Sequence, residues 1–340
     1  MNSRTSRIVS EGIDNLCGRE YDMWLQIRMY LLLALMFAIV YAVVVVAASM
    51  VGIGGFTFYV VFAVFLLTVQ YMIGPKMVEM SMKVRYVNES TYPELHRMVA
   101  ELARKAGITK PKIGISKLPI PNAFAFGRWR SDGRICVTEQ ITQLLSKEEL
   151  RAVLGHEISH LKHRDVTVIT MLSVVPMVLW YMAWTFMWNG GISGRRGNTV
   201  FLGLAAFLLY FITNLLVLYG SRIREYYADQ GSVNLGNPPH ALASALYKLV
   251  YGSAKVNKGA LKQMEGYKAF FVNDPSRAYY EIRELKQVDT DLSGTIDMNE
   301  LISLRAKNVK LSRGDKFMEA LSTHPNMIKR IKHLSHIAHS

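Results

Sequence analysis

Charge is scarce in this chain of 340 residues, because Asp, Glu, Lys and Arg make up only 19% of it while hydrophobic residues make up 51%. A soluble domain carries closer to one quarter charged residues, so long uncharged stretches must account for the deficit. No charged side chain occurs between Arg28 and Lys76, a run about twice as long as one membrane crossing requires. This composition excludes a purely soluble protein.

Cysteine is scarce too. Cys17 and Cys136 cannot form a disulfide framework, which indicates that the polar parts occupy a reducing compartment. The formal net charge of +14 would suit either nucleic acid or an anionic membrane surface. Since uncharged runs are present, we expect the lipid bilayer as a partner and no nucleic acid.

The uncharged runs predict four transmembrane helices in two hairpins. The first run divides at Gly52, Gly54 and Gly55, and the second pair is separated by a polar loop. No Asp, Glu, Lys, Arg or His lies within any predicted span, which argues against a transporter. The predicted spans are Tyr30–Met50, Phe56–Ile73, Val166–Trp188 and Val200–Tyr219.

An even number of crossings places both large polar regions on the same side of the membrane. These regions hold nearly all the Lys and Arg, so the positive-inside rule predicts a multi-pass protein of the cell membrane with its polar regions in the cytoplasm. The predicted order is a polar arm (1–28), a hairpin (29–74), a polar region (75–165), a second hairpin (166–219) and a polar region (220–340).

The first polar region predicts a small α+β domain. Tyr92–Gly107 is an amphipathic pattern typical of a helix, and Ser146 with Glu149 forms a capping box that opens another helix running to about Lys162. Three short segments between these helices are typical of strands: Lys112–Ser116, Ala123–Phe126 and Arg134–Thr138. The fold class is therefore a mainly α membrane protein with a small sheet in its polar domain.

An H-E-x-x-H sequence, His156 to His160, lies on the second of these helices. His156 and His160 are one turn apart on one face, so they can bind one zinc ion while Glu157 lies beside it. Glu157 can take a proton from water and return it to a leaving amine. The alternative is an ordinary solvated polar face.

Catalytic zinc needs a third protein ligand. His163 lies about 10 Å along the helix from His156, too far to share a tetrahedral ion. Glu225 and Asp229 are also one turn apart and follow the fourth predicted span, which suits one carboxylate on the metal and one holding a ligand imidazole. Alone, this pair is more typical of a salt-bridged juxtamembrane turn, and the zinc motif reverses that preference.

The chain resembles the HtpX family of membrane-bound zinc metallopeptidases. The resemblance rests on the uncharged hairpin, the zinc motif, two further spans, the Arg-Glu-x-x-Ala-Asp motif at 224–229 and Ser-Thr-His-Pro at 322–325. It implies a zincin-like catalytic domain split by a transmembrane hairpin, one zinc per subunit, and misfolded or damaged membrane proteins as substrates. By the same resemblance Glu225 is the third ligand, Asp229 supports a zinc histidine, and His324 helps to stabilise the oxyanion.

The resemblance also covers a substrate-binding strand, which falls on Asn122, Ala123, Phe124 and Ala125. An exposed strand edge offers unpaired N–H and C=O groups to an extended peptide, with little demand on its side chains. The alternative is a buried strand with Phe124 and Phe126 in the core, and the two interpretations are compatible.

Residues 289–300 fit the EF-hand calcium loop, a feature that the HtpX pattern does not include. Gly294 permits the sharp turn, and the alternative is a solvated acidic turn. The candidate calcium ligands are Asp289, Asp291, Ser293, Thr295, Asp297 and Glu300.

Two other functions are compatible with parts of this pattern. A CAAX-type prenyl endopeptidase uses similar zinc motifs, although four spans are too few for that group. A calcium-sensing membrane scaffold with an inactive metal site is the alternative outside enzymes, and the intact Glu157 argues against it. The sequence favours a zinc endopeptidase that cleaves membrane proteins or peptides.

Overall fold

The computed structural model describes residues 56–128, 130–188, 196–255, 278–285, 287–307 and 313–338. The predicted polar arm and first span lie outside these residues. The chain divides into two compact units. One comprises the described residues up to Val61 together with Leu172–Leu216, and the other comprises those of Phe62–Met171 and Val217–Ser340. Every candidate site residue falls in the second unit.

The second unit contains a four-stranded mixed sheet in the order β1-β2-β4-β3. β2 and β4 run parallel, whereas β1 and β3 pair antiparallel with their neighbours. The three predicted strands are confirmed, and β1 is an addition that the sequence did not predict. The bounds are β1 (Val84–Tyr86), β2 (Lys112–Ser116), β3 (Ala123–Phe126) and β4 (Arg134–Thr138). β3 therefore forms one edge of the sheet.

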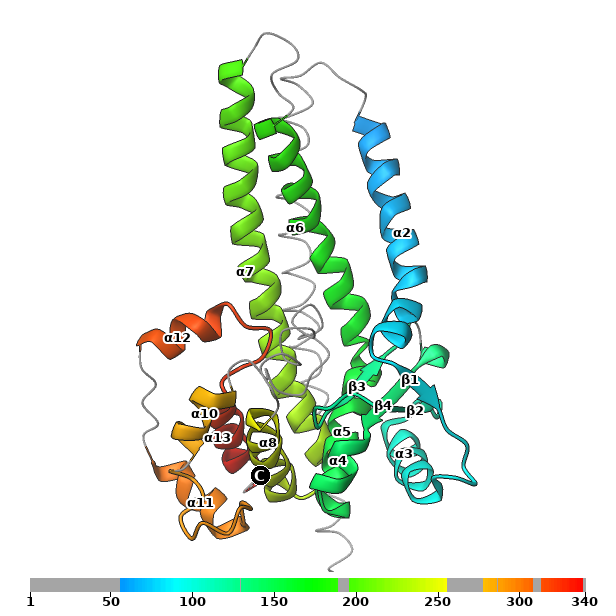
Figure 1. Ribbon diagram of the computed structural model, residues 1–340, viewed down its shortest axis with the longest axis vertical. Helices are drawn as coiled ribbons and strands as arrows, with labels where there is room; N and C mark the ends of the chain where they lie inside the picture. The colour runs from blue at the N-terminus through cyan, green and yellow to red at the C-terminus, as the bar shows by residue number, and fades with distance from the viewer. Residues whose placement is uncertain are drawn as a thin grey trace, which may run out of the picture. The chain divides into compact units, whose positions relative to one another are not determined.

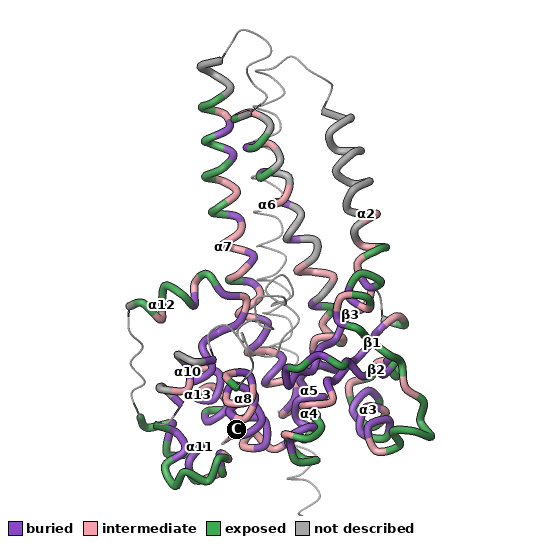
Figure 2. Tube along the Cα trace, viewed as in Figure 1, coloured by how far each residue is buried: buried purple, intermediate pink, exposed green. Residues whose placement is uncertain are grey.

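Alternating side chains of the strands pack on the two faces of the sheet. On one face Ile135 and Val137 join the main core, which helices α3 (Pro93–Ala106), α4 (Glu139–Leu144) and α5 (Lys147–His163) cover (Figure 1). On the other face Cys136 packs with Phe124 and Phe126 in a smaller cluster. Figure 2 shows the sheet and α5 as mostly buried. The zinc motif thus lies on a helix held against a rigid sheet.

Both ends of α5 are set by local chemistry. Ser146 Oγ accepts from the Glu149 N–H at 3.2 Å, and Glu149 accepts from the Ser146 N–H at 2.8 Å, which confirms the predicted capping box. Glu149 also bonds to Ser244 and Lys248 of α8 (Pro239–Ala254). At its other end α5 stops at Arg164, whose φ is +57°. α6 (Asp165–Trp188) begins at the next residue.

α7 (Arg196–Asn234) is longer than the sequence predicts. The predicted span ends at Tyr219, but no proline interrupts the polar residues that follow, and the helix continues to Asn234. Glu225 and Asp229 consequently lie on the same helix as the apolar stretch.

Among the described residues, one helix is long and apolar enough to cross a membrane, the Val200–Asn234 part of α7. α6 contains a shorter apolar segment, Val175–Trp184. The second predicted span falls within α2 (Phe56–Ser81). Helices therefore occupy three of the four predicted spans, whereas four crossings stay a prediction.

Within the described residues, four short helices follow α8 in the second unit. The last of them, α13, presents an apolar stripe formed by Met327, Ile331 and Leu334, and it packs against α8, α10 and α11 (Figure 1). Its N-cap is Asn326, whose side chain accepts from the Ile328 N–H at 3.0 Å. The bounds are α10 (Ala278–Leu285), α11 (Met298–Ala306), α12 (Arg313–Ala320) and α13 (Met327–Ile337).

Candidate metal centre and active site

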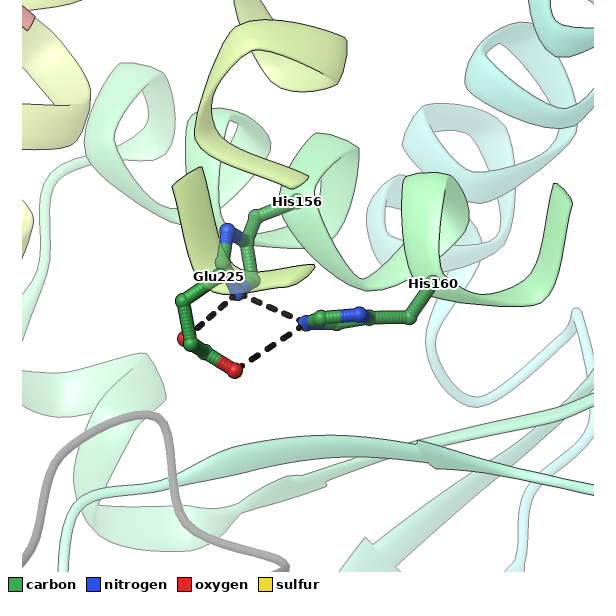
Figure 3. Close-up of side chains that lie close together, drawn as sticks. All are labelled: His156, His160 and Glu225. Carbon is green, nitrogen blue, oxygen red and sulfur yellow. Dashed lines mark hydrogen bonds and ion pairs between the residues drawn. The ribbon is translucent and has the colours of Figure 1, made fainter. Parts of the chain in front are cut away.

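Three side chains from two helices converge on one point. His156 and His160 of α5 face Glu225 of α7, as Figure 3 shows. The two Nε2 atoms lie 3.0 Å apart, and each lies 3.5 Å from a different oxygen of Glu225. The structure thus brings together the two histidines of the motif and the distant carboxylate, whereas His163 is not part of this group.

Small residues allow α5 and α7 to cross closely enough for this convergence. A Cβ on Gly231 of α7 would lie 2.1 Å from Ser159 Oγ, and one on Gly155 of α5 would lie 2.8 Å from Ser232 Oγ. Ser232 Oγ also donates to the Ala152 carbonyl at 2.6 Å, which joins the two helices directly. The two glycines therefore set the distance between the histidines and Glu225.

Each histidine has a carboxylate behind it. Asp229 lies 2.9 Å from His156 Nδ1, which agrees with the role that the resemblance implies. Asp165, the first residue of α6, lies 2.5 Å from His160 Nδ1 and is also paired with Arg224. With a carboxylate beside each Nδ1, the nitrogens that face Glu225, and that would bind a metal, are the two Nε2 atoms. The sequence analysis did not identify Asp165.

Arg330 of α13 was also missed, although it is completely buried beside the centre. Its Nε and Nη2 donate to the two oxygens of Asp229 at 2.9 and 2.6 Å, and its Nη1 lies 2.9 Å from Glu225. Two buried carboxylates need a buried cation, because an uncompensated charge is costly away from water. Arg330 supplies that charge and fixes the relative positions of both carboxylates.

These contacts shift the pKa values of the group in opposite directions. Burial disfavours a charged imidazole, but the hydrogen bonds that His156 donates to Asp229 and Glu225 outweigh it and raise the pKa of His156 to about 9. Burial and the charge of His156 lower the pKa of His160 to about 4. Burial opposes ionisation of Glu225, yet the charge of Arg330 holds its pKa well below the ordinary value. Glu225 is therefore an anionic ligand at neutral pH.

Glu157 interacts both with this group and with the sheet. It is 4% exposed, and burial raises its pKa, while a hydrogen bond from the backbone N–H of Ala125 acts in the opposite direction. Antiparallel pairing turns the N–H and C=O groups of alternate residues away from the partner strand. The Ala125 N–H therefore belongs to the free side of β3, next to the carboxylate of Glu157.

The predicted substrate strand is both an edge and a buried element. Asn122 precedes β3, and its N–H donates to Thr138 Oγ1 at 2.8 Å. Phe124 and Phe126 pack in the smaller cluster, so the buried-strand interpretation is correct for these side chains. Since their side chains are used for packing, only backbone groups of β3 are left to contact a peptide.

His324 lies in the loop between α12 and α13 and is 5% exposed. Its Nδ1 is 3.5 Å from Glu225, and its N–H donates to Ser322 Oγ at 3.2 Å. The structure therefore brings this residue, which is about one hundred positions from Glu225 in the sequence, to the candidate metal centre.

The EF-hand-like loop forms a second, separate acidic group. Oxygens of Asp289, Asp291 and Glu300 lie within 4.8 Å of one another. Asp297 caps α11 by accepting from the Glu300 N–H at 2.8 Å, and Ser293 Oγ lies 3.0 Å from Thr295 Oγ1. The structure thus brings together three of the six candidate calcium ligands. The side chains of the other three, Ser293, Thr295 and Asp297, form hydrogen bonds within the loop.

This chain is similar to proteins of a known peptidase family. The model of peptidase family M48, a family of metallopeptidases, matches residues 89–338. A "Protease HtpX homolog" of Methanothermobacter thermautotrophicus is 50% identical over 242 residues, 71% of this chain and 92% of the relative. Another, of Moorella thermoacetica, is 32% identical over 319 residues, 92% of this chain and 94% of the relative. The crystal structure of S. mikatae Ste24p aligns with a TM-score of 0.47 at 16% identity, over 94% of this chain and 67% of that one.

Proposed function

This chain belongs to peptidase family M48, and we propose that it is a membrane-embedded zinc endopeptidase that hydrolyses peptide bonds at a cytoplasmic active site. The observation that carries the proposal is the convergence of His156, His160 and Glu225 beside Glu157. Two imidazoles and one carboxylate are the ligand set of several catalytic zinc sites, which keep a fourth position for water or substrate.

The spacing of the three ligands fits one zinc ion per subunit. Ligand bonds of 2.0–2.1 Å in a tetrahedron place ligand atoms roughly 3.4 Å apart. The separations of 3.0, 3.5 and 3.5 Å between His156, His160 and Glu225 are close to that value. When bound, zinc would supply Lewis-acid polarisation of water and of the scissile carbonyl.

The protein's own groups perform the proton transfers. Glu157 is the general base that takes a proton from the attacking water and then gives it to the leaving amine. Burial raises the pKa of Glu157, which makes this carboxylate a stronger base toward the proton of water than an exposed one. Asp229, Asp165 and Arg330 act behind the ligands by holding their orientation.

Backbone groups of residues 122–125 are proposed to bind the substrate. The free side of β3 would pair with an extended peptide, and the Ala125 contact places Glu157 next to that side. His324 would donate to the oxygen of the scissile carbonyl as negative charge develops on it. Its burial beside Glu225 supports this role.

The proposed substrates are membrane proteins. The proposed role of the enzyme is the removal of membrane proteins that are misfolded or damaged. The name of the relatives, "Protease HtpX homolog", supports this choice over the CAAX-type prenyl endopeptidase. The membrane topology consists of four crossings with the catalytic domain in the cytoplasm, and the apolar stretch of α7 supports one of them.

We also propose that residues 289–300 bind calcium, at a site distinct from the zinc centre. The support is the gathering of Asp289, Asp291 and Glu300 within the spacing of an EF-hand loop. Unpaired loops bind calcium less tightly than paired ones, so the relevant concentrations are high micromolar to millimolar. The proposed effect is on the stability of the C-terminal helices, since a ligand that binds only the folded loop stabilises it.

Two measurements test the metal and the topology. Purified protein should contain about one zinc per chain, and Glu225→Ala should lose it while His163→Ala retains it. If His163→Ala loses as much zinc as Glu225→Ala, the assignment of Glu225 as the third zinc ligand is wrong. In intact cells, a tag at the C-terminus should be protected from external labelling, and a tag near Gly191 should be accessible from outside. Labelling of the C-terminal tag from outside would show that the orientation is the reverse of the one proposed.

A further inference from the structure

α12 turns apolar side chains away from the protein. Phe317 and Met318 of α12 are 65% and 53% exposed, and Leu321, the residue directly after the helix, is 41% exposed. Leu321 follows them by four and three residues, the spacing of neighbours on a helical surface. Figure 2 shows α12 as exposed along most of its length. A short helix with three neighbouring large apolar residues in water is unusual for a soluble surface and marks a site of contact.

Two charged residues of α12, Glu319 and Lys316, lie on different faces, and Asp315 is half-buried. Glu319 is 7% exposed and faces the protein, where it pairs with Lys329 and accepts from the Asn326 N–H. Lys316 is exposed beside the apolar face. The outward face therefore combines apolar side chains with a positive charge, a combination that suits an anionic lipid surface.

Arg222 of α7 contacts the C-terminal end of α12. Arg222 Nη1 donates to the carbonyls of Glu319 and Ala320 at 3.0 Å and to that of Ser322 at 2.7 Å. Carbonyls at a helix end lack partners within the helix and attract a cation. α12 is thus held at the level of Arg222.

Arg222 is the first charged residue after the apolar stretch of α7. It follows Tyr219 by three residues, about 4.5 Å of helix rise. Tyr219 is 54% exposed, and tyrosine is enriched at the level of lipid headgroups. If α7 crosses the bilayer, as the proposed function requires, the level of Arg222 is the membrane surface.

We infer that α12 is an interfacial helix and that its Phe317 and Met318, with Leu321 directly after it, insert into the boundary between lipid headgroups and acyl chains. The inference rests on the membrane embedding in the proposed function, and it adds a second contact between the catalytic unit and the bilayer. Ser322, which Arg222 contacts, bonds to His324, so this contact also holds the His324 loop close to the lipid surface.

Spin labels at single cysteines test the depth of this face. The full chain with Cys17→Ser is used as the background, because Cys136 is completely buried and will not react. Labels are placed at Phe317→Cys and Leu321→Cys, with two matched positions: Leu292→Cys, 79% exposed on the calcium loop, and Phe211→Cys, 46% exposed on the apolar part of α7. The protein is reconstituted in nanodiscs of phosphatidylcholine and phosphatidylglycerol.

Accessibility to oxygen, relative to a water-soluble nickel chelate, should be several-fold higher at 317 and 321 than at 292, and lower than at 211. Values at 317 and 321 equal to the value at 292 would overturn the inference. Spin–spin broadening at 317 in the singly labelled protein would identify a second copy as the occupant and would overturn it as well.

The same preparations separate this inference from the proposed function. Zinc content and peptide cleavage are also measured on the parent and on each labelled protein. If the label at position 317 is exposed to lipid but the parent cleaves no peptide, the interfacial helix is supported and the proposed enzymatic function is refuted. A water-exposed label at 211 would show that α7 does not cross the bilayer, and the inference would fail together with the membrane embedding.

Discussion

Gly231→Ala should weaken zinc binding far more than it weakens the fold. The added Cβ would lie 2.7 Å from Ser159 Cβ, whereas carbon atoms in contact are about 3.5–4.0 Å apart. α5 and α7 must therefore separate by about 1 Å. Metal–ligand distances tolerate only about 0.2 Å, so Glu225, on the same helix as Gly231, leaves the coordination distance of both histidines.

The two free-energy terms for the fold nearly offset each other. Overpacking costs about 1–3 kcal/mol, and replacing glycine by alanine in a helix stabilises it by about 1 kcal/mol. We expect a net destabilisation of about 0–2 kcal/mol. For zinc we expect a loss of affinity of about 10–100-fold, similar to the loss of a group that orients a ligand.

The assay is chelator competition for zinc in detergent, with thermal unfolding of the metal-free protein measured in parallel. Combining Gly231→Ala with Ser159→Gly removes both close contacts and leaves Ser159 Cα at 3.9 Å, an ordinary distance, so this double variant should recover affinity. Gly74→Ala serves as a control, since nothing lies within 4 Å of the added Cβ. Zinc affinity in Gly231→Ala equal to that of the parent would refute the reasoning.

Three further predictions concern other parts of the second unit. His324→Ala should retain zinc and lower kcat by about 10²–10³-fold with a small change in KM, which steady-state kinetics will measure; an unchanged kcat would remove His324 from the mechanism. Millimolar calcium should raise the melting temperature of the parent but not of Glu300→Gln. Identical melting curves of the parent with and without calcium would show that residues 289–300 are an acidic turn that does not bind calcium. Burial opposes the ionisation of Glu149, but Lys248 and Ser244 lower its pKa below 4.5. Ionised Glu149 therefore stabilises the fold at neutral pH, and this contribution disappears as the pH falls through the lowered pKa, so Glu149→Gln should flatten the acid side of a stability–pH curve.

Local patterns predicted the elements that carry the first half of the site. The capping box at Ser146 and Glu149 and the spacing of His156 and His160 both depend on residues within one or two helical turns. The structure confirms this helix, α5, and the three predicted strands β2, β3 and β4. Such features could be predicted because neighbours in the sequence decide them.

Contacts between distant segments were harder to predict. β1 has three residues and no alternation long enough to detect. Arg330 could have been found, since it lies beside Ile331 on the apolar stripe of α13, where a charged residue needs a buried partner. Asp165 could also have been found by searching near His160 for an acid that orients the imidazole.

The close crossing of α5 and α7 had no comparable signal. Gly155 and Gly231 each lie in an ordinary helical stretch, and single glycines in helices are common. Their role in setting the distance between α5 and α7 becomes visible only when the two helices are packed against each other. The same limit applies to the contact of Arg222 with α12, which joins residues about one hundred positions apart.

Zinc content and peptide cleavage, measured side by side in detergent for the parent and Glu157→Gln, test the central claim most directly. The account predicts about one zinc per chain in both proteins and cleavage by the parent alone, because the ligands hold the ion while Glu157 only moves protons. Cleavage by Glu157→Gln at the rate of the parent, or cleavage by the parent that persists after zinc is removed, would contradict it.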